Sequence, residues 1–505
     1  MCGILLVKSR HDIPKDQHLE AVDVLKSRGP DRTRYQYQNN IFIAQVVLHI
    51  TGTDDYYNRD HENFLAYNGE IYNYKDFGNY GNDIEFVDDC VNNNARALAQ
   101  GWGPWAWAWT NGNIVRYGAD PQGEKTLYQY QDDDILIVCS ELAPILKYKK
   151  FDKIPSVYST RHWTMLEQTP YAGITRVIPG WEYVDGKISQ CIDMLWNWIN
   201  PTSCSFQEAQ QEFNTLWKQT IATMTPSCPV ALTYSCGLDS SIILSHLDDA
   251  ELYATNMMGK DPIVDHIEDF LTGTEMSRLN QLHITEECWA EYFCEIIKRT
   301  QMPVQSWSFV GQWAIAKHCE QRVLFTGAGA DELFGGYSVY QNMDFNNNSP
   351  YSANSPLWQW CMDSYNGHRG QATLLADYWH QISGCDIRGV DTIAGAHGIE
   401  ARNPFLAKPI IEFALNLPFE YKVNQFVNKP VIRELFLQRW SDSHIWPKKG
   451  FSGHCNDSLP YINVAVSATD RHSQWRDAVI NSFHKDSNQP LYKTNHDQKL
   501  PSHVL

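Results

Sequence analysis

The hydrophobic positions of this chain change their spacing along its length. Residues 4–7 form a short apolar run, which predicts a buried strand, and residues 19–25 carry apolar side chains at helical spacing. Residues 105–109 alternate Trp with Ala, which is typical of a strand with one tryptophan-rich face. Residues 230–234 form another apolar run, and apolar residues at helical spacing follow it. The pattern predicts strands and helices in both halves of the chain.

The pattern changes near residue 203, where we place a domain boundary. Ser205 and Glu208 have the spacing of a helix capping box, and apolar residues from Phe213 to Trp217 follow at helical spacing. A chain of 505 residues is too long for a single core. The sequence becomes polar from about His484. We therefore expect two domains, residues 1–203 and 204–483, and a polar tail over residues 484–505.

Composition narrows the class of protein. The chain has 41 Lys and Arg against 59 Asp and Glu, a net charge of -18, which argues against non-specific binding of nucleic acid. No uncharged apolar run is long enough to span a bilayer, and the first residues lack the features of a signal peptide. The 13 cysteines include no Cys-x-x-Cys pair, which argues against a disulfide framework or a zinc ribbon. We therefore expect a cytoplasmic protein that binds neither nucleic acid nor membranes.

Residues 229–241 predict an anion-binding loop between a buried parallel strand and a helix. A glycine in the loop lets the backbone approach a ligand closely, and the unpaired amides at the start of the helix favour negative charge. An aspartate beside a phosphate requires a divalent cation between them. No Gly-Lys-Ser/Thr follows, so the loop is not the usual P-loop, and an ordinary serine-rich turn is the alternative. The expected contacts are Ser235, Gly237, Asp239, Ser240 and Ser241.

Cys2 directly follows the initiator methionine. Removal of Met1 would leave a residue with both a thiol and a free α-amine, and an amine with a pKa near 8 can act as the local base. By itself the position is weak evidence, because Cys2 can equally be a small second residue. The motifs that follow it decide between the two interpretations.

Four polar motifs follow Cys2 along the first half. They are Ser27-Arg-Gly-Pro-Asp-Arg32, Tyr67-Asn-Gly-Glu-Ile-Tyr-Asn-Tyr74, Gly81-Asn-Asp-Ile-Glu-Phe86 and Asp120-Pro-Gln-Gly-Glu-Lys-Thr-Leu-Tyr128. Asn68-Gly69 alone also fits a β-turn. In this order, the motifs and Cys2 resemble the class II glutamine amidotransferase domain. The resemblance implies a four-layer αββα N-terminal-nucleophile hydrolase sandwich, with two stacked β-sheets between helical layers.

The resemblance also implies roles for single residues. Cys2 matches the nucleophile, Asn68 and Gly69 match the donors that stabilise the oxyanion, and Glu70 and Asp83 match the residues that hold the α-amino group of glutamine. Arg28, in the Arg-Gly-Pro-Asp motif, lines the same site.

One position departs from this family. Where the family has Arg-Leu-Ser-Ile, whose arginine pairs with the α-carboxylate of glutamine, this chain has Val47-Leu-His-Ile50. A bidentate anchor is therefore missing. Arg32 and Arg34 are the alternatives for this role.

The second half resembles the ATP pyrophosphatases and the asparagine synthetases. Residues 229–241 match the Ser-Gly-Gly-Leu-Asp-Ser-Ser loop, with Cys236 in place of its first glycine. Residues 322–337 match a Ser-Gly-Glu-Gly-Ser-Asp-Glu motif, in which Asp331 corresponds to a magnesium-linked aspartate with Asp239 as its partner. The resemblance implies an α/β parallel sheet of the ATP-pyrophosphatase (adenine nucleotide α-hydrolase-like) type, which binds ATP and Mg²⁺ and cleaves ATP between its α and β phosphates.

Further matches complete this site by resemblance. The expected nucleotide contacts are Leu232, Met258, Gly327 and Lys429, of which Met258 has core packing as its alternative. Lys448-Lys-Gly-Phe-Ser452 matches a loop near the nucleotide. Ala328 stands where the family has a carboxylate, and Glu332 is one candidate for part of the role of that carboxylate. Residues 398–407 match a Gly-Val-Glu-Ala-Arg-x-Pro-Phe-Leu-Asp motif, in which Ala407 replaces the final aspartate. The acceptor-site candidates are Glu332, Glu400 and Arg402, with a purely structural pair as the alternative for the last two.

From Cys2 to about Ser452 the chain therefore resembles the glutamine-hydrolysing asparagine synthetases. The resemblance implies that ammonia released from glutamine reaches an acyl-adenylate of aspartate and forms asparagine, AMP and pyrophosphate. Ala328 keeps open an amidotransferase for another carboxylate, and a β-lactam synthetase relative fits less well. The two departures, Val47 and Ala328, also leave open a catalytically impaired paralogue that binds or regulates. A homodimer is left open.

Overall fold

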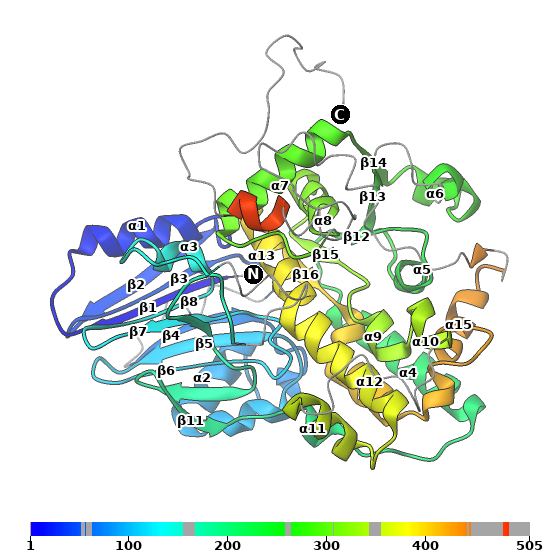
Figure 1. Ribbon diagram of the computed structural model, residues 1–505, viewed down its shortest axis with the longest axis horizontal. Helices are drawn as coiled ribbons and strands as arrows, with labels where there is room; N and C mark the ends of the chain where they lie inside the picture. Colours follow the sequence, from blue (N-terminus) through cyan, green and yellow to red (C-terminus); the bar gives the residue numbers. More distant parts are fainter. Residues whose placement is uncertain are drawn as a thin grey trace, which may run out of the picture.

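In the computed structural model, the described residues form three β-sheets, two antiparallel and one parallel (Figure 1). Both antiparallel sheets are formed by residues 3–191. The parallel sheet is formed by strands that lie between residues 230 and 402. We call residues 3–191 the N-terminal sandwich and residues 206–441 the parallel-sheet part. The structure describes residues 2–51, 56, 63–154, 167–257, 264–306, 308–342, 355–441, 444–445 and 478–483.

The N-terminal sandwich is built from two antiparallel sheets. The six-stranded sheet has the order β2 (Arg32–Gln38), β3 (Ile41–Val47), β1 (Gly3–Ser9), β8 (Ile135–Cys139), β7 (Tyr128–Gln131) and β9 (Ile174–Arg176). The five-stranded sheet has the order β11 (Lys187–Cys191), β10 (Trp181–Val184), β6 (Val115–Ala119), β5 (Trp105–Thr110) and β4 (Phe64–Gly69). Strand β1 lies inside its sheet and pairs with β3 on one side and β8 on the other, and Cys2 directly precedes it.

Alternation along the strands creates four layers. Ile4 and Leu6 of β1 pack with Ala106 and Ala108 of β5 in the core between the two sheets. The opposite face of β1 packs against helix α1 (Lys15–Leu25), while the tryptophans of β5 pack against α2 (Asp83–Asn93) on the outer face of the other sheet. The short helix α3 (Leu142–Ile145) follows β8. The expected αββα sandwich is confirmed, as is the tryptophan-rich face of residues 105–109.

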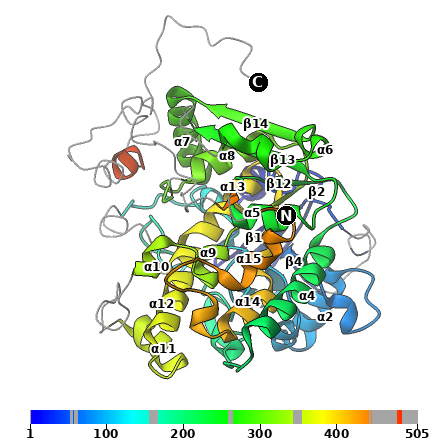
Figure 2. The same ribbon diagram turned by 90° about the vertical axis from the view of Figure 1, so that its right-hand side faces the viewer.

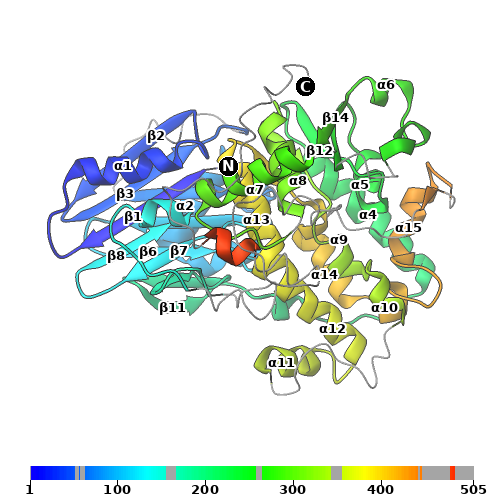
Figure 3. The ribbon, with the colours of Figure 1, turned by 45° about the horizontal axis from the view of Figure 1, so that its top comes forward.

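The parallel sheet has the order β14 (Leu279–Ile284), β13 (Glu251–Met257), β12 (Val230–Thr233), β15 (Val323–Phe325) and β16 (Glu400–Arg402), and its strand pairs are all parallel. Helices α7 (Glu286–Thr300) and α8 (Ser308–His318) lie on one side of it, and α4 (Phe206–Met224) and α5 (Leu238–Leu244) lie on the other (Figure 3). The expected strand of residues 230–234 and the capping box of Ser205 and Glu208 are confirmed.

One continuous helical segment of the parallel-sheet part lies beside the N-terminal sandwich. It consists of α12 (Arg369–Asp377), a π-helical stretch (Tyr378–Asp386) and α13 (Ile387–Ala396). Figure 1 shows this segment between the N-terminal sandwich and the rest of the parallel-sheet part. Figure 2 shows α12 and α13 of the same segment after a turn of 90°. Other α-helices among the described residues are α6 (Gly273–Met276), α9 (Ala330–Phe334), α10 (Ser338–Asn342), α11 (Pro356–Ser364), α14 (Lys408–Asn416) and α15 (Pro430–Leu437). Within the described residues, no helix is long and apolar enough to cross a membrane.

Candidate active sites

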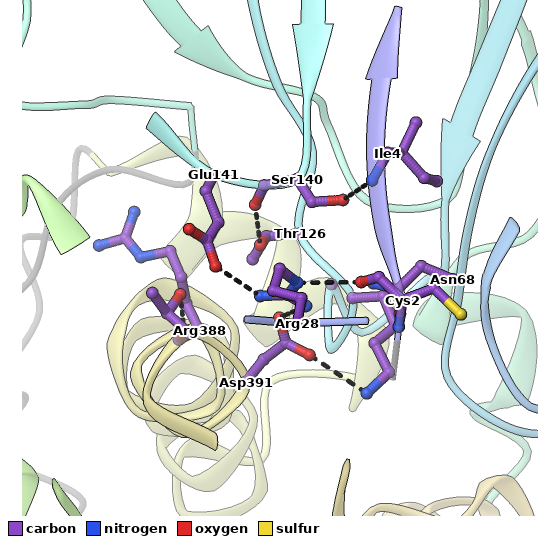
Figure 4. Close-up of polar contacts among 12 residues, drawn as sticks. Cys2, Ile4, Arg28, Asn68, Thr126, Ser140, Glu141, Arg388 and Asp391 are labelled. Carbon is purple, nitrogen blue, oxygen red and sulfur yellow. Dashed lines mark hydrogen bonds and ion pairs between the residues drawn. The ribbon is translucent and has the colours of Figure 1, made fainter. Parts of the chain in front are cut away.

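Cys2 directly precedes the first residue of strand β1 and is buried. Its backbone nitrogen donates a hydrogen bond to Asn68 Oδ1 at 2.8 Å, and its carbonyl accepts one from Arg28 Nε at 2.9 Å (Figure 4). The Nδ2 group of Asn68 is also buried, and it has no hydrogen-bond partner within the described residues. A buried amide donor beside a thiol is the arrangement that stabilises an oxyanion.

Asn68 and Gly69 lie in a strand rather than in a β-turn. They form the end of β4 and pair with Ala106 and Trp105 of β5. A Cβ atom at residue 69 would lie 2.2 Å from the carbonyl oxygen of Pro104, so only glycine fits this close approach. The turn alternative for Asn68-Gly69 is therefore excluded.

Gln45 is a polar neighbour of Cys2 that the sequence interpretation missed. Burial raises the pKa of the Cys2 thiol, whereas hydrogen bonds from the Leu48 backbone and the Gln45 side chain oppose this shift. Gln45 Nε2 also donates to the Tyr67 carbonyl at 2.6 Å, so the side chain is fixed. A single polar residue inside the apolar run of β3 was the available signal, because a buried amide requires partners.

Glu70 and Asp83 lie close to each other near the Asn68-Gly69 segment. Asp83 Oδ2 accepts hydrogen bonds from the Tyr67 hydroxyl at 2.9 Å and the Ile71 amide at 3.1 Å. Burial is the largest cause that raises the pKa of Glu70 to about 8 and that of Asp83 to about 6. Two neighbouring, partly exposed carboxylates favour a cationic group, as the α-ammonium of an amino acid would be.

The departure at Val47 leaves an apolar side chain in this region. Val47 is buried at the end of β3 and pairs with Arg32 of β2. Arg34, the other alternative for a carboxylate anchor, places its guanidinium over the ring of Phe64, 4.2 Å from the centroid. Of the two alternatives for the carboxylate anchor, Arg32 lies beside Val47 in the neighbouring strand, whereas the guanidinium of Arg34 lies over aromatic rings.

Arg28 is held by a buried network that joins the two parts of the molecule. Arg28 Nη1 contacts Glu141 Oε1 at 3.2 Å, and Nη2 contacts Asp391 Oδ2 of α13 at 2.8 Å (Figure 4). Lys125 Nζ donates to the other oxygen of Asp391 at 3.1 Å. Burial alone would lower the pKa of Arg28, but Asp391 and Glu141 raise it above its ordinary value. Asp391 was not expected from the sequence, because no motif marks it.

The expected ATP-binding loop connects β12 to α5. Ser240 Oγ donates to the Gly237 carbonyl at 3.1 Å and lies 3.2 Å from Ser235 Oγ, so the two hydroxyls face each other across the loop. Ser241 Oγ lies 3.4 Å from the Tyr234 hydroxyl. Cys236 has a φ of 54°, which is the left-handed region that favours glycine. The glycine that Cys236 replaces would therefore adopt this conformation without strain.

The structure brings Asp239, Asp331 and Lys429 together. Lys429 Nζ lies 2.5 Å from Asp239 Oδ1 and 2.6 Å from Asp331 Oδ1, and the lysine is buried. A Cβ atom at Gly336 would overlap both Asp331 and Lys429, so this glycine permits their approach. A Cβ atom at Gly327 would lie 3.2 Å from the Asp239 Cβ. Asp239 follows β12 and Asp331 follows β15, at the carboxyl ends of strands, where ligands bind in α/β sheets, whereas Lys429 directly precedes α15.

Two carboxylates are a suitable donor set for Mg²⁺. This ion usually binds one or two carboxylates together with substrate phosphates and water. Among the described residues there is no group of three or more His, Cys, Asp or Glu side chains that could hold a metal ion. Leu232 is buried in β12 below the loop. Met258 and the Lys448–Ser452 loop lie outside the described residues.

The three acceptor-site candidates do not lie together. Glu332 is buried beside Asp331 and accepts a hydrogen bond from the Tyr337 hydroxyl at 2.5 Å; burial, with Asp331 and Asp386, raises its pKa to about 8. Arg402, by contrast, reaches from β16 to Glu70 of the sandwich at 3.3 Å and to Glu400 at 2.9 Å. Glu400 and Arg402 thus contact residues expected to bind glutamine.

The fold and these two groups of residues define a two-part protein: an amidotransferase-type sandwich with a cysteine at residue 2, joined to a parallel sheet of the type that binds nucleotides. Two family models match it, the glutamine amidotransferase domain over residues 1–86 and asparagine synthase over residues 215–504. The second match covers more than half of the chain, and the chain belongs to the asparagine synthase family.

Several curated relatives match most of the chain, and two of them illustrate the similarity. It is 22% identical to "Asparagine synthetase [glutamine-hydrolyzing]" of Gallus gallus, over 89% of this chain and 82% of that protein. It is 24% identical to "Putative asparagine synthetase [glutamine-hydrolyzing] 1" of Methanocaldococcus jannaschii, over 85% of this chain and 83% of that protein. A solved structure of the allosteric regulatory enzyme of purine biosynthesis aligns over 46% of this chain and 60% of that chain, with 14% identity and a TM-score of 0.29.

Proposed function

We propose that the chain is a glutamine-hydrolysing ligase that converts aspartate to asparagine at the cost of ATP cleavage to AMP and pyrophosphate. The observation that carries the proposal is Asn68, which holds the Cys2 nitrogen through Oδ1 and keeps a buried Nδ2 donor beside the thiol. The match of the asparagine synthase family to residues 215–504 supports the second reaction. We further propose that the two reactions belong to domains of residues 1–203 and 204–483.

The first reaction follows from the geometry around Cys2. After removal of Met1, the α-amine of Cys2 would be the base nearest to its own thiol, and the thiolate would attack the side-chain amide of glutamine. Asn68 Nδ2 and the Gly69 amide would stabilise the resulting oxyanion. Glu70 and Asp83 would hold the α-ammonium group. Ammonia leaves, and water releases glutamate from the thioester.

The second reaction would occur at the carboxyl ends of β12 and β15. The carboxylate of aspartate attacks the α-phosphorus of ATP, which forms an aspartyl-adenylate and releases pyrophosphate. Lys429 would neutralise the leaving pyrophosphate, and the hydroxyls of Ser235, Ser240 and Ser241 would donate to its oxygens. Asp239 and Asp331 would hold Mg²⁺, which supplies further neutralisation of phosphate charge when bound. Ammonia then attacks the acyl carbon and AMP leaves.

A second candidate differs only in the acceptor. Ala328 provides no carboxylate, and its backbone amide is hydrogen-bonded to the Thr326 hydroxyl at 3.3 Å. A carboxylate at this position is the expected group for substrate recognition or proton transfer, which alanine cannot perform. An acceptor other than aspartate therefore fits this observation.

One experiment distinguishes these functions. Purified protein would be incubated with magnesium ATP, aspartate and amide-labelled glutamine, and pyrophosphate, glutamate and labelled asparagine would be followed together. We expect all three products, and Cys2→Ala should abolish the glutamine-dependent part while ammonia still supports synthesis. Glutamate without asparagine would favour another acceptor. Absence of all three products would contradict the proposed function.

A further inference from the structure

Four charged residues form an acidic cluster between the two parts: the buried Glu400 and Arg402 and the partly exposed Glu70 and Asp83. Each side chain is within hydrogen-bond or electrostatic range of another member, and Arg402 is the only cation among them. The cluster has three acids and one base, so its acids outnumber its cation, although Lys125 also acts electrostatically on Glu400 from outside the cluster. It lies beside Asn68-Gly69 and next to Cys2, on whose thiol Glu400 acts electrostatically. A buried excess of carboxylates is stable only when a cation or protons are bound.

Arg402 has a fixed geometry within this cluster. Its Nε donates to Glu400 Oε1 at 2.9 Å, its Nη2 donates to Glu70 Oε2 at 3.3 Å, and its Nη1 donates to the Met224 carbonyl. The guanidinium also lies over the Tyr72 ring, 5.4 Å from the centroid. The side chain is 1% exposed. Because an arginine fork held at three points cannot rotate, it fixes the direction of the carboxylate that it contacts.

The second oxygen of Glu70 is fixed as well. Thr51 Oγ1 donates to Glu70 Oε1 at 2.8 Å. Burial is the largest cause that raises the pKa of Glu70, Arg402 is the next and opposes it, and Asp83 and Glu400 raise it further. Without Arg402, the same carboxyl would be buried among acids with no cation against it. It would then hold its proton more tightly and bind an ammonium group more weakly.

We propose that Arg402 is a positioning residue for glutamine: from β16 of the parallel-sheet part, it stabilises the ionised form of the Glu70 carboxylate and directs it toward the α-ammonium of the substrate. The inference rests on the proposed glutamine hydrolysis and adds that recognition of glutamine by the sandwich depends on a residue of the other part. Arg402 acts through Glu70 and need not touch the substrate.

The cluster gives Arg402 and Glu400 opposite effects. Removing Arg402 should move the titration of Glu70 to higher pH, whereas removing the charge of Glu400 should move it to lower pH. The other titratable groups that face Glu70 are Asp83, Tyr67, Tyr72 and Tyr74. The pKa values of the three tyrosines are raised, so these groups stay neutral across the relevant range.

The test measures the affinity for glutamine as a function of pH. Calorimetric titrations would use the full chain with Cys2→Ala as the background, so that neither the thiol nor turnover contributes. The variants are Arg402→Met, Arg402→Lys, Glu400→Gln and Glu70→Gln. Arg322→Met is the matched control, because Arg322 forms another ion pair between the two parts, with Asp31.

We expect Arg402→Met to weaken binding about 10-fold or more at pH 7, because the ionised fraction of Glu70 falls about 10-fold when its pKa, already above the pH, rises by about 1. Glu400→Gln should strengthen binding by about 5-fold at the same pH. Arg402→Lys should keep part of the affinity, and Glu70→Gln should remove the dependence on pH in this range. Arg322→Met should leave unchanged the midpoint of the pH dependence of glutamine affinity.

The outcomes separate this inference from the proposed function. In one outcome, the background protein binds glutamine while Arg402→Met and Glu400→Gln move the midpoint of the pH dependence in the same direction, or do not move it. Either result would show that the positioning role of Arg402 is wrong. If Arg402→Met does not fold, the direction of the Glu400→Gln shift still decides. If the unmodified chain neither binds nor hydrolyses glutamine, the proposed function itself fails.

Discussion

Arg28 and Asp391 form a buried ion pair of 2.8 Å although 363 residues separate them in the chain. The same guanidinium donates to the carbonyl oxygen of Cys2. Helix α13 of the parallel-sheet part is therefore linked by two successive hydrogen bonds to the residue expected to be the nucleophile. The position of the Cys2 backbone depends on contacts that the N-terminal sandwich does not supply alone.

Replacement of Asp391 should destabilise the protein strongly. Asp391→Ala leaves Arg28 and Lys125 buried without their shared carboxylate, and breaking a buried pair costs about 3–5 kcal/mol. We expect a loss of this size in urea unfolding, together with reduced glutamine hydrolysis. Asp23→Ala is the control, because Asp23 forms an exposed pair with Lys26, and such pairs contribute about 0–1 kcal/mol. Equal effects of the two changes would contradict the structural role of Asp391.

Glycine should be tolerated better than alanine at residue 236. Cys236 is buried with a φ of 54°, where a Cβ atom is unfavourable by about 1 kcal/mol or more. Both Cys236→Gly and Cys236→Ala remove the sulfur, but only the glycine relieves the strain. We expect Cys236→Gly to be more stable than Cys236→Ala by about 1 kcal/mol in thermal unfolding, the reverse of the usual order. A more stable alanine variant would show that the backbone at this position is not strained.

Lys429 should be essential for the ATP-dependent reaction only. Lys429→Met removes the cation that lies between Asp239 and Asp331, so we expect pyrophosphate release to fall by about 100-fold or more. Glutamine hydrolysis in the absence of ATP should be retained, which controls for folding. Lys429→Arg should recover part of the rate if charge alone matters. Unchanged pyrophosphate release in Lys429→Met would remove this residue from the proposed site.

Glu124 should make the stability of the protein depend on pH. It is buried, Asn403 Nδ2 donates to its Oε1 at 2.8 Å, and burial raises its pKa to about 8 from an ordinary value near 4.5. The folded state therefore holds a proton that the unfolded state releases between these values. Its contribution to stability is complete below about pH 4.5 and is lost as the pH rises toward 8, by about 1.4 kcal/mol for each step of one in pH.

The variant Glu124→Gln tests this dependence. The amide cannot titrate, so the free energy of unfolding should fall less steeply with pH than in the unmodified protein, and the difference between the two should grow from pH 5 to pH 8. Urea unfolding at several pH values measures it, and subtraction removes the contribution of the other buried carboxyls. Parallel curves would show that Glu124 does not carry the expected proton.

Local features of this protein were predictable because each depends on residues close together in the chain. The apolar run before residue 235 predicted β12, the alternation of residues 105–109 predicted β5 and its two faces, and the motifs around Cys2, Asn68 and Asp239 indicated both chemistries. Periodicity and motif spacing survive in any tertiary context, because they follow from backbone geometry. The strand that contains Asn68-Gly69 was less certain, since the same dipeptide suits a turn and only pairing with β5 excludes it.

The sequence by itself determined the four-layer sandwich, the parallel sheet, the family and most of the candidate residues. Only the tertiary structure decided that Glu400 and Arg402 reach Glu70, that Asp391 holds Arg28, and that Gln45 faces Cys2. The physical reason is that buried charges take whichever partners the packing of distant elements provides. Such pairs have no fixed spacing along the chain, so they become visible only when helix α13 and strand β16 are placed against the N-terminal sandwich.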